Sequence, residues 1–121
     1  MKILTSNLMP PALDWVVSMR EGKVWATWRF MDAYSDDKEG RYHYAEDWAL
    51  SGPIIEREGI GLMETEVGSG EWESFKWLNS NKHMPLIESG PTPLIAAMRC
   101  YVASQLGDEV DVPDELVGEK A

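Results

Sequence analysis

The residue types best suited to binding chemistry gather around a Ser-Gly-Pro segment at residues 51–53. Asp47 and Trp48 precede this segment, Tyr44 lies just upstream of them, and Arg57 follows it. Aromatic rings and a carboxylate in one loop suit a planar polar ligand, since loops carry binding residues more often than cores do. Trp48 is therefore expected to form one wall of a ligand pocket. Arg57 would anchor a carboxylate or phosphate of the ligand, or else form an ion pair with the acids beside it.

A second Ser-Gly-Pro segment, residues 89–91, comes directly before Thr92. In both segments a glycine, which tolerates any backbone angle, precedes a proline, which fixes one, so each predicts a defined corner. Thr92 and Pro93 are the residue types of a helix start. Free N–H groups and the helix dipole at that point attract anions, although plain capping by Thr92 explains the same residues. A pocket that combines Thr92 with Trp48 requires the two segments to lie close together.

No pattern in the sequence singles out a catalytic or metal-binding group. There is no Gly-x-Ser-x-Gly, no phosphate-binding P-loop and no pair of acids at a distinctive spacing. The single cysteine, Cys100, lies in an apolar helical pattern, and the two histidines, His43 and His83, lie far apart. A zinc site needs clustered ligands, and a nucleophilic thiol needs an activating neighbour. We therefore expect no catalytic residue, no metal and no cofactor.

The net charge is −10, from 21 acidic and 11 basic residues in a chain of 121. Such a surface repels phosphate groups, so we expect neither direct nucleic-acid binding nor attachment to an anionic membrane. It is compatible with a basic protein partner, and also with an ordinary cytoplasmic protein that has no such role. No segment is apolar enough to cross a bilayer or to act as a signal peptide.

Six tryptophans are an unusual number for this length. Large rings bury much area per residue, so core packing accounts for most of them. Two or three would instead line a groove for a planar ligand, and exposed ones would favour a homo-oligomer. The sequence leaves these alternatives open.

The spacing of apolar residues indicates two helices and several strands. The helices are expected over 12–20 and 93–106, each followed by a glycine that ends it. The strands are expected over 1–4, 24–31, 60–67 and 71–78, the last two forming an antiparallel hairpin.

Other stretches are less regular. Residues 32–41 have the composition of a solvated loop, 42–48 suit a strand or a loop, and 53–58 suit a short helix or an extended segment. An acidic tail is expected over 108–121, partly anchored by apolar residues at 110, 112 and 116.

Two amphipathic helices need a surface on which to bury their apolar stripes, and a small antiparallel sheet supplies it. The sequence therefore predicts an α+β fold in which an N-terminal and a C-terminal helix pack on a small antiparallel sheet. The length predicts a single domain over 1–121.

Three blocks of sequence resemble a family of small lambdoid-phage accessory proteins known as NinX. They are the run Ala12–Val17, the run from Asp47 to Glu58, and the run from Gly90 to Val110. There is a looser similarity to phage ABA sandwich domains, which also place a helix first and a Thr-Pro-Leu helix last. The resemblance implies helices packed on a sheet, a phage origin and expression in the cytoplasm of a bacterial host. It brings no activity and no catalytic residues.

These observations favour a non-enzymatic phage accessory protein that binds a small polar or planar, nucleotide-like ligand through Tyr44, Asp47, Trp48, Arg57 and Thr92. Sequestering a host defence signal would be one use of such binding. The alternative is an acidic inhibitor or adaptor that acts on a basic host protein through its charged face.

Overall fold

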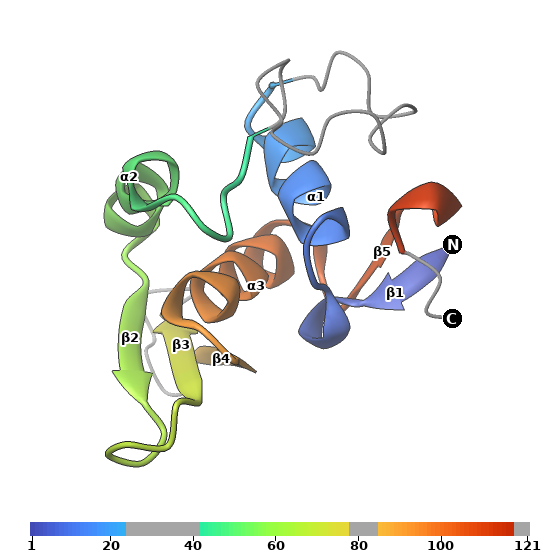
Figure 1. The fold of residues 1–121 in the computed structure, drawn as a ribbon. Helices are drawn as coiled ribbons and strands as arrows, with labels where there is room; N and C mark the ends of the chain where they lie inside the picture. Colours follow the sequence, from blue (N-terminus) through green and yellow to red (C-terminus); the bar gives the residue numbers. More distant parts are fainter. Residues whose placement is uncertain (24–41, 78–84, 118–121) are drawn as a thin grey trace.

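The computed structural model describes residues 1–23, 42–77 and 85–117 (Figure 1). The strand predicted over 24–31 and the loop predicted over 32–41 lie outside these residues. In chain order the elements are β1 (Lys2–Leu4), η1 (Thr5–Asn7), α1 (Ala12–Arg20), α2 (Trp48–Glu58), β2 (Gly61–Glu64), β3 (Trp72–Lys76), β4 (Leu86–Gly90), α3 (Pro93–Leu106), β5 (Glu109–Asp111) and η3 (Asp114–Leu116). The α+β class is confirmed, as are both predicted helices and the hairpin of β2 and β3.

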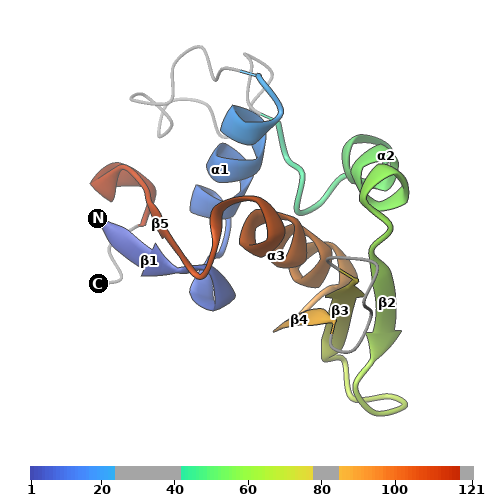
Figure 2. The same cartoon turned by 180° about the vertical axis from the view of Figure 1, so that it is seen from behind.

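The larger sheet is antiparallel, in the order β2-β3-β4, and α3 covers one of its faces (Figures 1 and 2). The buried hydroxyl of Ser74 in β3 donates to the carbonyl of Ala96 in α3 at 2.6 Å, so strand and helix are in direct contact. Gly90 ends β4 against the same helix. A Cβ atom at Gly90 would lie 2.9 Å from the Ala96 nitrogen, which explains why a glycine stands where the chain turns into α3.

A second sheet of two strands pairs β1 with β5 (Figure 1). β5 lies inside the stretch expected to be an acidic tail, so part of that tail is a strand and the 3-10 helix η3 follows it. The three apolar residues expected to anchor the tail, Val110, Val112 and Leu116, are all buried. The segment Glu109–Val112 forms a strand because acids alternate with valines in it. This alternation gives the strand one buried and one exposed face.

α3 forms the centre of the molecule and lies between the two sheets (Figures 1 and 2). Every residue from Leu94 to Ala103 is buried. α1 packs against α3, so the contact of the N-terminal helix is with the other helix, while the predicted arrangement placed both helices on one sheet. The expected spacing of apolar residues in α1 was correct, but it did not reveal which surface those residues face.

α2 contains the first Ser-Gly-Pro segment, so the predicted corner at residues 51–53 is wrong. The helix begins after Asp47, whose carboxylate accepts from the Ala49 N–H at 2.9 Å, and ends at Gly59 with a φ of 68°. Pro53 removes one helical hydrogen bond, the one that would reach Ala49. The hydroxyl of Ser51 donates to the carbonyl of Tyr44 and joins the helix to the preceding turn.

Candidate functional site

Trp48 and Thr92 border a common hollow between the start of α2 and the start of α3. Its volume is about 270 Å³, and it is lined by Ala45, Glu46, Trp48, Thr92, Pro93 and Leu94. Trp48 is 53% exposed, so much of its side chain is available for contact. We call this site the Trp48 hollow. The structure thus brings together two residues of the predicted pocket, although the first Ser-Gly-Pro segment is helical.

The turn that carries Glu46 is held by both neighbouring helices. The buried carboxylate of Asp14 in α1 accepts from the Ala45 N–H at 2.8 Å. On the other side, Ser51 of α2 donates to the Tyr44 carbonyl. One wall of the Trp48 hollow therefore rests on rigid elements, which favours a preformed site.

Thr92 acts as the N-cap of α3. Plain capping was the alternative to an anion site at this residue. Its Oγ1 accepts from the Ile95 N–H at 3.1 Å and its carbonyl accepts from the Ala96 N–H at 3.0 Å. Pro93 has no N–H to offer. Most of the first-turn donors of α3 are thus already used or missing, and the capacity of this helix end to hold an anion is small.

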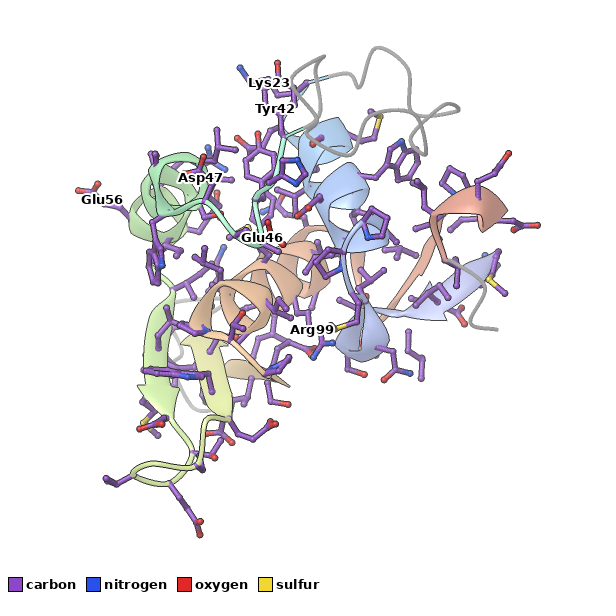
Figure 3. All side chains as sticks on the ribbon, in the orientation of Figure 1. Lys23, Tyr42, Glu46, Asp47, Glu56 and Arg99 are labelled. Atoms are coloured by element: carbon purple, nitrogen blue, oxygen red, sulfur yellow. The ribbon has the colours of Figure 1, made fainter. Side chains whose placement is uncertain are left out.

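The acids at the start of α2 have different positions. Asp47 is exposed and its carboxylate caps α2, while Glu46 lines the hollow. Figure 3 labels both side chains. Sequence reasoning missed Glu46. Its position next to Asp47, in the turn that leads into a helix, was the available signal.

Tyr44 does not line the Trp48 hollow. Its side chain is only 3% exposed and its ring lies 6.2 Å from the Tyr42 ring, between centroids, at a tilt of 34°. Burial raises the pKa of the Tyr44 hydroxyl above its ordinary value. Tyr44 belongs to the core and supports the turn rather than offering a ring face to a ligand.

Arg57 lies at the opposite end of α2 from Trp48, about 14 Å away along the helix axis. Its guanidinium donates to both carboxylate oxygens of Glu21, at 2.7 and 3.1 Å, and to Glu58 at 2.9 Å. It also stands 5.8 Å from the centre of the Tyr101 ring. Of the two roles expected for Arg57, a ligand anchor or an ion pair, it therefore has the ion pair. It does not line the Trp48 hollow.

These contacts make a network that joins four elements. Tyr101 of α3 donates to Glu21, which follows α1, and Lys76 of β3 donates to Glu58 of α2 at 2.6 Å. Hydrogen bonds from Arg57 lower the pKa of Glu21, and those from Lys76 and then Arg57 lower the pKa of Glu58. Burial raises the pKa of the Tyr101 hydroxyl, and its bond to Glu21 adds to this.

The groups that the Trp48 hollow offers to a ligand are the ring of Trp48, the carboxylate of Glu46 and the hydroxyl of Thr92. None of the described residues that line it carries a positive charge. A planar ligand that is neutral or cationic fits this set, because the ring offers a stacking surface and Glu46 accepts hydrogen bonds. Among these described lining residues, a phosphate group would meet a carboxylate and no cation.

The environment of Cys100 does not favour a reactive thiolate. Cys100 is buried and burial raises the pKa of its thiol to about 11, which keeps the thiol protonated at neutral pH.

Residues 1–23, 42–77 and 85–117 contain no group of three or more acids, histidines or cysteines arranged to hold a metal ion. Within the same ranges, each helix is too short or too polar to traverse a lipid bilayer.

A comparison with known families gives one finding. A family model described as bacteriophage P22 NinX matches residues 4–105, which run from the end of β1 almost to the end of α3. β5 and η3 lie beyond the matched range. No curated protein matches the chain.

Proposed function

The chain belongs to the NinX family of bacteriophage P22, and we propose that it is a non-enzymatic phage accessory protein that binds a small planar ligand in the Trp48 hollow. The observation that carries the proposal is the exposed ring of Trp48 beside Glu46 and Thr92 in a hollow of about 270 Å³. That volume is close to the lower limit of about 300 Å³ for small-molecule pockets. It suits a single heterocycle better than a dinucleotide.

The proposed ligand is a nucleobase-like heterocycle that is recognised without its phosphate. Support for this choice comes from the charges: Glu46 lines the hollow, the net charge of the chain is −10, and Arg57 is bound to Glu21 and Glu58. The heterocycle would stack on Trp48 and donate hydrogen bonds to Glu46. Binding of this kind would let a phage protein sequester a host defence signal in the bacterial cytoplasm.

We expect Trp48→Ala to weaken ligand binding without unfolding the protein. Aromatic stacking on a base contributes about 1–3 kcal/mol, so the affinity should fall by about 5- to 150-fold. Native mass spectrometry of the protein purified gently from a bacterial host should show a small molecule that departs on denaturation, and Trp48→Ala should lack it.

The matched control is Trp77→Ala, because Trp77 is another exposed tryptophan and does not line the hollow. This variant should retain the small molecule. An adduct that survives in Trp48→Ala would remove the Trp48 hollow as the binding site.

A second candidate function, binding to a basic host protein, is favoured by a different observation. Five acids lie within residues 108–115 and all five are exposed: Asp108, Glu109, Asp111, Asp114 and Glu115. The described residues after 107 include no lysine or arginine. The α-ammonium of Met1 lies 2.9 Å from Asp111 and 3.2 Å from Asp114, which leaves the other three carboxylates to present a concentrated negative surface.

Neutralising Asp108, Glu109 and Glu115 to their amides should weaken a salt-sensitive complex with basic host proteins. The charged surface raises association rates at low ionic strength, and screening removes this effect. The measurement is quantitative co-purification from a bacterial lysate at low and high salt. A control variant with Glu46, Glu56 and Glu66 neutralised has the same net charge, and equal losses in the two variants would show that overall charge, rather than this surface, is responsible.

A further inference from the structure

β5 has a main-chain edge that no described element covers. Main-chain bonds join Thr5 to Asp108 and Met1 to Val112, so the bonded pairs of this antiparallel ladder are 1 with 112, 3 with 110 and 5 with 108. Glu109 and Asp111 are therefore the non-bonded partners of Leu4 and Lys2. Their N–H and C=O groups point away from β1, and no hydrogen bond among the described residues uses them.

A groove lies alongside this edge, between β5, α1 and the end of α3. Its volume is about 410 Å³, larger than the Trp48 hollow. The lining combines apolar side chains with charged ones: Trp15, Val16, Met19, Arg20, Leu106, Glu109, Val110 and Asp111. Met19 and Leu106 are partly exposed apolar side chains on its walls, and sequence analysis identified neither of them as part of a site.

The negative charge around β5 favours a basic partner. Glu109 and Asp111 are exposed, and Asp108, Asp114 and Glu115 lie close by in sequence. Among the described lining residues the basic one is Arg20, and its guanidinium already donates to the Gln105 side chain at 2.7 and 3.0 Å. The edge of β5 thus offers hydrogen bonds and negative charge together.

We propose that an extended basic segment of a partner protein adds to the open edge of β5 as a further strand. The main chain of the segment bonds to Glu109 and Asp111, its basic side chains meet their carboxylates, and its apolar side chains, at every second position, enter the groove. This proposal rests on the second candidate function and names its site.

A second copy of the same chain is a poor occupant of this edge. Two-fold pairing of β5 with itself would place the acids of one copy opposite those of the other, and like charges on paired strands are destabilising. The net charge of −10 on each copy adds to this repulsion. A basic segment removes both costs.

The test is a titration of the full chain with a short peptide in which lysine and valine alternate, followed by fluorescence anisotropy. Wild-type protein should bind this peptide with an affinity that falls as salt is added, and should not bind a matched peptide of glutamate and valine. Glu109→Pro removes the outward N–H but breaks no bond to β1, and proline is tolerated as the first residue of an edge strand. Its affinity should be about tenfold lower than that of Glu109→Gln, which removes the same charge and keeps the N–H.

A second measurement uses wild-type protein, so its result does not depend on whether the proline variant folds. In wild-type protein the peptide should shift the amide resonances of Glu109 and Asp111 and slow their hydrogen exchange, which requires no mutation. Equal affinities of the proline and glutamine variants, or no change at these two amides, would overturn the proposed strand addition. In that case a host complex still weakened by neutralising Asp108, Glu109 and Glu115 would leave the second candidate function standing with a different mode of contact.

Discussion

Replacing Arg99 by methionine is expected to lower the free energy of unfolding by about 2–4 kcal/mol. Arg99 is only 7% exposed and lies where α3 meets the end of η1 and the end of β4 (Figure 3). Its Nε donates to the Leu8 carbonyl at 2.9 Å and its Nη1 donates to the Ser89 carbonyl at 2.7 Å. Its Nη2 also lies 3.1 Å from the sulfur of Met9. One side chain thus joins three parts of the chain that are distant in sequence.

The cost arises because methionine fills a similar volume but donates no hydrogen bond. The Leu8 carbonyl would lose a buried hydrogen bond and the Ser89 carbonyl a partly buried one, and an unsatisfied buried group costs about 1–3 kcal/mol. Part of this loss is offset because Arg99 is itself costly to bury: burial lowers its pKa, and no carboxylate of the described residues lies within ion-pair distance. Arg99→Lys should also destabilise the protein, since one ammonium group cannot reproduce the planar fork.

Urea denaturation of both variants measures this effect. The matched controls are Arg20→Met and Arg20→Lys, because Arg20 is an exposed arginine whose bonds go to the Gln105 side chain. The controls should change stability by less than about 1 kcal/mol. Similar losses at positions 20 and 99 would contradict the role given to the buried guanidinium.

The elements that sequence reasoning located correctly are those whose signals are local. α1 and α3 show apolar residues at helical spacing, and Thr92 with Pro93 defines the start of α3. The hairpin of β2 and β3 combines alternation with a glycine-rich turn, where Gly68 and Gly70 both have a φ of 79°. In each case the residues that decide the structure lie within a few positions of one another.

The errors arose where distant contacts overrode a local preference. Gly52 and Pro53 disfavour a helix, yet α2 continues through them because Ser51 bonds to the preceding turn and Ile54 is buried in the core. β5 pairs with β1, whose residues lie more than a hundred positions earlier, so the acidic stretch alone could not show that it forms a strand. The packing of α1 on α3 is likewise a property of the whole fold.

The candidate site was recovered only in part for the same reason. The prediction placed Trp48 and Thr92 in one pocket because each lies beside a Ser-Gly-Pro segment. The structure places both at one hollow. Tyr44 and Arg57 were included because they are near Trp48 in sequence. On a helix, however, nine residues separate Trp48 from Arg57 by more than two turns, so closeness in sequence did not become closeness in space.

Arg57→Gln is expected to destabilise the protein by about 1–2 kcal/mol at neutral pH and to lose this effect in acid. The guanidinium neutralises Glu21 and shares Glu58 with Lys76, and the side chains of both acids are 16% exposed. The substitution leaves the largely buried Glu21 with neutral donors and Glu58 with Lys76 as its cation. The pKa of each carboxyl is lowered in the folded protein from an ordinary value of 4.5. A lowered pKa contributes stability that is complete above the unfolded value and is lost as the pH falls from 4.5 through the folded value.

The measurement is the free energy of unfolding of wild type and Arg57→Gln from neutral pH down to acid pH, with Arg20→Gln as control. The two curves should converge as the pH falls, since protonated Glu21 and Glu58 no longer need a cation. The control should run parallel to wild type, because Arg20 is bonded to a neutral amide. A difference that stays constant with pH would mean that Arg57 stabilises the fold by packing on the Tyr101 ring rather than by its charge.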